Sequence, residues 1–375
     1  MKKMTRTIIA LFVIAEMLLI PAAGVQDTTD FGAMDFSAAD FGAADFTPVT
    51  VVNSVGTAVT FEEPAQKAAS LGISFTTTLL ALECGDSIVL IDQYSSDSNS
   101  GITELASHPA SSHSYPVGNG EQIAQLLADG MGGFDKTRDV VFIYGYAYHA
   151  DAIRSMEALG LKVVTFYPAT YSEGVEMVTE IGAIMGKNSK AAEITQEMKS
   201  ASAYYSQTLE ENGIAGDSRV KAVYVSYSGG NMRIGNINSY SVILLKIAGG
   251  VNPADDANMI GSALISYGID DTALIQLDPD VIFLDPNYSG TAEEFRAEKN
   301  LKDSVRVYKL SMIMNQYGPS SMDGIEYMAK AMYPDIFGYL DDEQAADKAG
   351  NTLLYVLAVC AFLAIAAIAY TALRR

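Results

Sequence analysis

Tryptophan is absent from this sequence, and cysteine and histidine are scarce, with two and three residues respectively. Cys84 lies well inside the chain and Cys360 in an apolar run near its end, so the two are not expected to pair and no disulfide framework supports the fold. The histidines, His108, His113 and His149, lack acidic or thiol partners at metal-site spacing. The sequence also lacks a Gly-x-Ser-x-Gly elbow, a Walker loop and a His-Glu-x-x-His motif, so it predicts no cofactor and no enzymatic activity.

Basic residues are few as well: 24 Lys and Arg stand against 45 Asp and Glu, and the net charge is −21. Setting aside residues 1–24 removes three positive charges and one negative charge, and setting aside Arg374 and Arg375 removes two more positive charges, which leaves about −25. Such a surface repels phosphate backbones and anionic lipid headgroups. Nucleic acid is therefore not expected as a partner, whereas a neutral or cationic ligand is compatible with this charge.

Both ends of the chain are apolar. Lys2, Lys3 and Arg6 precede the apolar run 8–20 and the small residues 22–24, an arrangement typical of a secretory signal peptide, predicted here as residues 1–24. Whether this signal is cleaved stays open. Residues 353–373 are uncharged, almost wholly apolar and long enough to span a bilayer, and Arg374 and Arg375 follow them. The sequence therefore predicts a cell-surface protein, anchored in the cytoplasmic membrane by a C-terminal transmembrane helix.

Two polar spacers separate these ends from the middle of the chain. Residues 25–50 contain the dipeptide Asp-Phe four times with a period of five, which fits neither a helix face nor a strand face. We interpret this segment as a flexible spacer, with adhesion through its phenylalanines as the alternative. Residues 340–352 form the second linker.

Strand-like and helix-like segments alternate between the spacers, which is typical of an α/β fold with a parallel, doubly wound sheet. The run Asp139-Val-Val-Phe-Ile143 matches Asp280-Val-Ile-Phe-Leu284, and similar elements flank both runs. The sequence thus predicts two doubly wound lobes, residues 51–168 and 214–339, with a cleft between the carboxyl ends of their strands.

Residues 169–213 are predicted to join the lobes as a rigid helical connection. Thr170 and Glu173 have capping-box spacing, while Gly186 and Gly213 suit left-handed positions after helices. Residues 189–212 carry an apolar stripe at three- and four-residue steps. The segment 170–185 is favoured as the bridging helix, because it directly follows the last strand of the first lobe.

Tyrosines are concentrated in the loops expected after the strands. A tyrosine ring packs against a flat or bulky ligand while its hydroxyl forms hydrogen bonds, and an arginine can meet an anionic group of the ligand. The candidate ligand-binding residues are Phe75, Tyr94, Tyr144, Tyr146, Tyr227, Asn231, Arg233, Tyr240, Tyr288 and Tyr317.

Several segments resemble the ABC-transporter substrate-binding proteins for iron complexes, siderophores, haem and cobalamin (class III). Residues 55–61 are similar to that family's opening hairpin, and residues 70–89, which include Phe75, to its first strand, helix and strand. Residues 244–252 are similar to its helix ending in Gly-Gly-x-Asn, and residues 277–283 to its second-lobe strand signature. A C-terminal span in place of a lipid anchor is similar to archaeal members.

The resemblance implies that a metal complex is captured between the lobes and delivered to an ABC permease and its ATPase by a monomeric protein. It also implies one acidic docking residue for the permease on each lobe. Glu121 matches the first position, whereas the second falls at Thr272, so Asp271 beside it is the candidate. A metal-dependent enzyme or chelatase-like protein on a related fold, and an adhesion or sensing ectodomain, stay open as alternatives.

Overall fold

The computed structural model describes residues 46–53, 56–98, 100–260 and 264–340. The predicted signal peptide, nearly all of both spacers and the predicted span 353–373 lie outside these residues. Within the described part, no helix combines the length and apolarity needed to cross a membrane.

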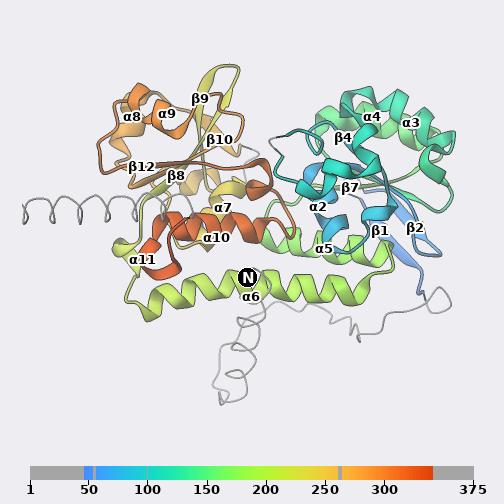
Figure 1. The fold of residues 1–375 in the computed structure, drawn as a ribbon, viewed down its shortest axis with the longest axis horizontal. Coiled ribbons are helices and arrows are strands. Elements are labelled where there is room, and N and C mark those ends of the chain that lie inside the picture. Colours follow the sequence, from blue (N-terminus) through green and yellow to red (C-terminus); the bar gives the residue numbers. More distant parts are fainter. Residues whose placement is uncertain (1–45, 54–55, 99, 261–263, 341–375) are drawn as a thin grey trace, which may run out of the picture. The chain divides into compact units, whose positions relative to one another are not determined.

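The first lobe is built on a sheet of five parallel strands in the order β5-β4-β3-β6-β7. A separate hairpin, β1 (Val49–Val52) and β2 (Ala58–Phe61), precedes it, as predicted, and Gly56 has a positive φ of 85° in its turn. The elements that follow are shown in Figure 1: β3 (Ala68–Leu71), α2 (Ile73–Ala81), β4 (Ile88–Asp92), β5 (Ser114–Tyr115), α3 (Gly120–Ala128), β6 (Val140–Tyr144), α4 (Ala150–Ala158) and β7 (Lys162–Phe166).

The second lobe is built on a mixed sheet in the order β10-β9-β8-β11-β12. Strands β8, β11 and β12 are parallel, but β9 and β10 run antiparallel to their neighbours, so the expectation of a wholly parallel sheet is wrong for this lobe. The elements are β8 (Ala222–Ser228), β9 (Asn231–Gly235), α7 (Tyr240–Ile247), β10 (Ser266–Gly268), α8 (Asp271–Gln276), β11 (Val281–Leu284), α9 (Ala292–Glu298), β12 (Arg306–Lys309), α10 (Ser321–Met332) and α11 (Pro334–Phe337).

The two matching strands occupy equivalent positions. Strand β6 lies between β3 and β7, and β11 lies between β8 and β12. The aspartate before each strand has a similar contact: Asp139 accepts hydrogen bonds from the backbone N–H groups of Gln66 and Lys67, before β3, and Asp280 accepts one from Lys221, before β8. The sequence match therefore reflects an internal structural repeat.

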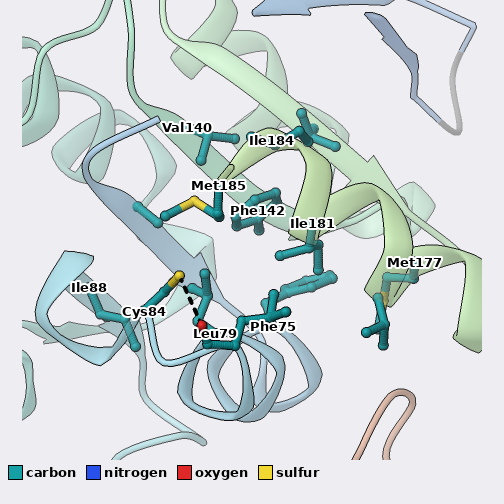
Figure 2. Packing of buried hydrophobic residues seen from close by; sticks show 14 of the residues in the cluster. Phe75, Leu79, Cys84, Ile88, Val140, Phe142, Met177, Ile181, Ile184 and Met185 are labelled. Carbon is teal, nitrogen blue, oxygen red and sulfur yellow. Dashed lines mark hydrogen bonds between the residues drawn. The ribbon is translucent and has the colours of Figure 1, made fainter. Parts of the chain in front are cut away.

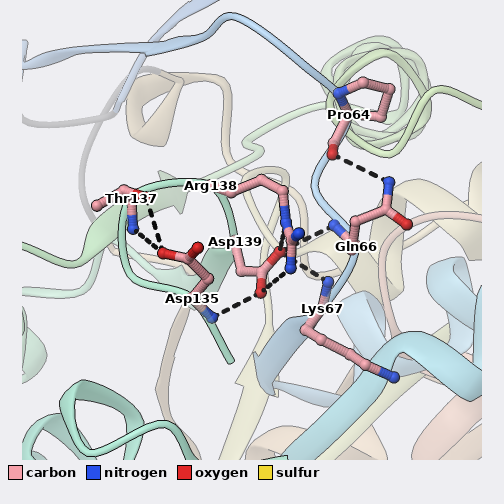
Figure 3. A network of polar contacts seen from close by, with 7 residues as sticks. All are labelled: Pro64, Gln66, Lys67, Asp135, Thr137, Arg138 and Asp139. Atoms are coloured by element: carbon pink, nitrogen blue, oxygen red, sulfur yellow. Dashed lines mark hydrogen bonds and ion pairs between the residues drawn. The ribbon is translucent and has the colours of Figure 1, made fainter. Parts of the chain in front are cut away.

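Asp139 is the centre of a buried polar network at the start of the first sheet (Figure 3). Its carboxylate is fully buried and accepts backbone N–H groups from Gln66 (2.9 Å), Lys67 (3.0 Å) and Asp135 (2.8 Å), while Arg138 pairs with it at 2.8 Å. Burial would raise the pKa of this carboxyl, but the Arg138 guanidinium and the backbone donors outweigh it, so the pKa is lowered. The network therefore holds the segment before β3 against the segment before β6.

Two helices, α5 (Tyr171–Ile184) and α6 (Asn188–Glu211), connect the lobes. The predicted capping box closes the start of α5, since Thr170 accepts from the Glu173 N–H and Glu173 accepts from the Thr170 N–H. Gly182 lets the helices approach closely, because a Cβ at this position would lie 2.3 Å from that of Ala191.

Helix α6 spans both cores, and the preference for 170–185 as the bridging helix is wrong. The buried apolar side chains of α5 pack in the core of the first lobe, where Met177, Ile181 and Ile184 face Phe75 and Phe142 (Figure 2), and only its first residue, Tyr171, also packs against the second core. Helix α6 places Met198 in that same core and Leu209 in the core of the second lobe. It runs along both α5 and α10 (Figure 1), so the longer helix carries the connection.

Candidate functional site

Seven aromatic residues from both lobes form a continuous group, here called the inter-lobe aromatic cluster. In the first lobe they follow the carboxyl ends of three neighbouring strands, β3, β6 and β7, where the strand order reverses and doubly wound sheets place ligands. The second lobe adds one residue at the start of α7 and one after the short 3-10 helix η9 (Met312–Asn315). The members are Phe75, Tyr144, Tyr146, Tyr148, Tyr167, Tyr240 and Tyr317.

The rings are in direct contact across the two lobes. Tyr144 lies 4.6 Å from Phe75, 5.1 Å from Tyr146 and 6.1 Å from Tyr317, measured between ring centroids. Tyr317 in turn lies 4.3 Å from Tyr240. These separations are those of favourable aromatic pairs, so the rings form one packed surface between the lobes.

The cluster extends outwards through two exposed tyrosines that the sequence analysis did not select. Tyr148 stacks on Tyr146 at 5.1 Å, and Tyr167 meets Tyr146 edge-on at 5.3 Å. Tyr148 is 76% exposed and Tyr167 is 50% exposed. Exposed rings that are held in place by neighbouring rings offer an apolar face to a ligand at little cost in conformational entropy.

Gly72, at the end of β3, makes the position of Tyr144 possible. A Cβ at Gly72 would lie 2.5 Å from Cε2 of Tyr144. The Tyr144 ring therefore lies directly against the β3–α2 turn, and a side chain at Gly72 would force it to move.

Hydrogen bonds join the lobes beside these rings. The Tyr144 hydroxyl oxygen lies 2.7 Å from Ser74 Oγ and 3.2 Å from Gln316 Oε1, and its single proton can serve one of them at a time. Ser74 Oγ also accepts the Tyr317 backbone N–H at 3.0 Å. The segment after β12 thus binds directly to the start of α2.

The same chain of contacts continues into the second lobe. The Gln316 side-chain N–H donates to Asn315 Oδ1 at 3.3 Å, and Asn315 donates to the Tyr224 hydroxyl at 3.0 Å. Tyr224 in turn donates to the Asp285 carboxylate, which follows β11. The Asp285 carboxylate of the second lobe is therefore connected to Tyr144 of the first lobe through three side chains, those of Tyr224, Asn315 and Gln316.

Burial keeps the phenols of the cluster neutral. It raises the pKa of Tyr144, Tyr146, Tyr240 and Tyr317 far above the usual value of a tyrosine. These residues therefore act as hydrogen-bonding hydroxyls and apolar faces, and not as phenolate anions.

Tyr240 has a buried hydroxyl that is poorly satisfied. The residue is 8% exposed, and Ser321 lies near enough to lower the pKa that burial raises, but no hydrogen bond of ordinary geometry reaches its oxygen among the described residues. A buried polar group in this condition costs about 1–3 kcal/mol. A ligand or a water molecule that reached it would recover this free energy.

His149 borders the cluster, with its ring 4.4 Å from that of Tyr148. Its Nδ1 lies 3.0 Å from the carbonyl oxygen of Tyr144. Because a carbonyl only accepts, Nδ1 is the donor in this contact.

The other candidate ligand-binding residues lie apart from the ring contacts of this cluster. Tyr227 and Tyr288 contact one another at 5.3 Å beside Phe295 in the second lobe. Tyr94 follows β4 and is 52% exposed.

Asn231 and Arg233 belong to β9, so their expected place in a loop is wrong. Arg233 donates to Ser266 Oγ (3.0 Å) and to the Ser266 carbonyl (2.5 Å), and the exposed Asn231 amide contacts only the Gly229 carbonyl among the described residues.

The two candidate docking acids have different surroundings. Glu121, in the first turn of α3, is exposed and lines a surface cavity of about 370 Å³ together with Asp151. Asp271, in the first turn of α8, pairs with Lys299 Nζ at 3.1 Å. Glu121 is thus available to a basic partner, whereas Asp271 already has one.

No known protein-family profile matches this chain. Two curated proteins are similar to it over most of its length. An uncharacterised ABC transporter substrate-binding lipoprotein, YvrC of Bacillus subtilis, is 25% identical over 77% of this chain and 87% of its own. A cobalamin-binding protein of Halobacterium salinarum is 23% identical over 76% of this chain and 74% of its own.

Solved structures share the fold. Helicobacter pylori CeuE, in a complex with nickel and histidine, aligns with a TM-score of 0.60 and 19% identity over 79% of this chain and 91% of its own. The names of the two curated relatives describe a substrate-binding protein of an ABC transporter and a cobalamin-binding protein, and this chain shares its fold with CeuE.

Proposed function

We propose that this chain, an ABC-type substrate-binding protein by sequence similarity and fold, captures a metal chelate at the inter-lobe aromatic cluster and delivers it to an ABC permease and its ATPase. The observation that carries the proposal is the meeting of tyrosines from both lobes around Tyr317 and Tyr144. A site between two lobes can enclose a ligand and present it, enclosed, to a membrane partner. The candidate ligands are an iron–siderophore complex, haem and a corrinoid.

The chemistry of the cluster favours a chelate over a bare metal ion. Among the described residues, no group of three His, Cys, Asp or Glu side chains is placed to hold a metal ion. The neutral phenols of Tyr144 and Tyr317 are poor metal ligands, but their rings and hydroxyls suit a large, partly apolar molecule that brings its own metal donors. The protein would then bind and release its ligand without a chemical step.

The remaining parts of the proposal concern placement and docking. We propose that the lobes lie outside the cell, tethered by the apolar segment 353–373, which rests on the sequence alone. Glu121 and Asp271 would meet basic residues of the permease. In that complex, Asp271 would either bind Lys299 and the basic residue of the permease together or give up its ion pair with Lys299.

The proposal is tested by thermal unfolding of the purified full-length protein with haemin, cyanocobalamin and ferric hydroxamate complexes. A ligand at one hundred times its Kd stabilises a protein by about 2.7 kcal/mol, which appears as a higher Tm. Tyr317→Ala and Tyr146→Ala should abolish this rise, whereas Tyr204→Ala, on the exposed side of α6, should retain it.

Absence of any rise in Tm with every chelate would refute the binding function. A rise that persists in both cluster variants would place the site elsewhere. The residues Tyr227 and Arg233 are the next to be substituted in that case, because the sequence analysis selected them as well.

A further inference from the structure

We infer that the site selects its ligand by charge and takes neutral or cationic metal complexes in preference to anionic ones. This inference rests on the proposed function and narrows its ligand class. It follows from the positions of the acidic and basic side chains around the inter-lobe aromatic cluster.

Two carboxylates lie behind the cluster without a basic partner. Asp285 accepts from Tyr224, which is linked through Asn315 to Gln316 beside the Tyr144 ring. On the first lobe, Asp92 is 2% exposed at the end of β4 and accepts only from Tyr94 and Ser95 among the described residues. In the part of the chain that the structure describes, neither carboxylate has a Lys or Arg within 4.0 Å.

The basic residues nearest to these strand ends in the second lobe are engaged elsewhere. Arg233 is held by Ser266, and Lys299 pairs with Asp271 and Glu298. Lys309 donates to the backbone carbonyls of Tyr288 and Gly290. The bidentate arginine contact that would recognise a carboxylate or a catecholate is thus not offered at the cluster by these residues.

The polar groups of the cluster are phenol hydroxyls and the Gln316 amide, and the His149 imidazole lies beside Tyr148. Such donors can bind an anionic group, but they do not replace the hydration of a full charge as a cation would. The surrounding chain, with its large excess of acidic residues, adds a long-range potential of the same sign. An anionic chelate therefore loses hydration and is also repelled, whereas a neutral one escapes both costs and the attraction of the acidic surroundings offsets the lost hydration of a cationic one.

The test uses one chelate whose charge alone is varied. Ferrioxamine B is cationic through its free terminal amine, its N-acetyl derivative is neutral and its N-succinyl derivative is anionic, while the iron coordination is the same. Cyanocobalamin and its anionic tricarboxylate, made by hydrolysis of side-chain amides, form a second matched series. Affinities are measured with the full-length protein at low and high ionic strength.

We expect the anionic member of each series to bind about tenfold more weakly than its neutral or cationic counterpart at low salt, with the difference shrinking as salt is raised. Asp285→Asn should reduce the discrimination several-fold, and Asp285→Glu, which retains the charge, should preserve it. Asp217→Asn, which removes one exposed acid at the opposite end of β8, serves as the matched control and should change nothing.

The outcomes separate this inference from the function on which it rests. Equal or tighter binding of the anionic members would overturn the charge preference and leave chelate binding intact. If a folded Asp285→Asn variant still binds the anionic chelates more weakly by the same factor, Asp285 is not the source of the charge preference and that assignment is overturned. Failure of every member of both series to bind, together with haemin, would refute chelate binding itself.

Discussion

The hydroxyl oxygen of Tyr144, at the end of β6, lies 3.2 Å from the side-chain oxygen of Gln316, which belongs to the segment after β12. The two residues are 172 positions apart in the sequence and come from different lobes. The contact joins the lobes beside the aromatic cluster. Substituting Tyr144 therefore tests how much the polar contacts between the lobes contribute to the free energy of unfolding.

Tyr144→Phe should lower the free energy of unfolding by about 1 kcal/mol, because it removes the hydroxyl that Ser74 and Gln316 share and leaves the ring in place. Tyr148→Phe is the matched control: it removes an exposed hydroxyl and retains the stacking on Tyr146. Chemical denaturation of both variants measures the difference. Equal stability of the two would show that the Tyr144 hydroxyl contributes nothing across the lobes.

Tyr240→Phe should act in opposite directions on stability and on ligand binding. Removing a buried hydroxyl that has no partner among the described residues should raise the free energy of unfolding by about 1 kcal/mol. If a chelate uses this hydroxyl, its affinity should fall about five- to tenfold at the same time. Calorimetric binding and thermal unfolding on one preparation test both effects, and a loss of stability would contradict the assignment of an unsatisfied group.

Asp139 should make the stability of the protein sensitive to acid. Its pKa is lowered in the folded state by Arg138 and by backbone donors, so the carboxylate stabilises the fold above its unfolded pKa of about 3.9. That stabilisation is lost as the pH falls through the lower folded value. Asp139→Asn should cost about 3 kcal/mol at pH 7 and flatten this acid dependence.

Asp280→Asn is the internal control for that prediction. Asp280 occupies the equivalent position in the second lobe, but it is exposed and accepts a single backbone N–H, from Lys221. Its loss should cost about 1 kcal/mol or less. If both variants lose the same stability, burial of Asp139 is not what makes its network strong.

Helix α6 should limit the relative movement of the lobes. Ala203→Pro interrupts the helix between Met198, in the first core, and Leu209, in the second, at an exposed position. Distances between spin labels on α3 and α9 should become broadly distributed in this variant. Ala203→Ser retains the helix and should leave the distribution narrow, and an unchanged distribution in the proline variant would mean that α6 does not act as a strut.

Local signals accounted for most of the fold. Largely apolar runs of four or five residues became β3, β6, β7 and β11, because strands of this kind are buried on both faces in either sheet. Strands β9 and β10 were missed because they are short and their burial depends on partners far along the chain. Gly229-Gly230, which makes the β8–β9 turn, was the one local sign of this hairpin.

The site was predictable only in part, for a related reason. The tyrosines that follow strands of the first lobe could be selected from their position, since parallel strands end at one edge of a sheet. Tyr148 and Tyr167 were missed, although each follows the same strand ends within a few residues. No pattern in the sequence indicated that Tyr227 and Tyr288 would pair with each other away from the cluster.

The sequence by itself determined the α/β class, the internal repeat around Asp139 and Asp280, the capped helices of the connection and the acidic charge. All of these can be read from short stretches of the chain, through capping signals, apolar runs or composition. Only the tertiary structure decided that α6 bridges the lobes, that Tyr317 meets Tyr144, and that Arg233 is held by Ser266 away from the cluster. Those contacts depend on how two sheets and two helices pack together, which short-range patterns do not encode.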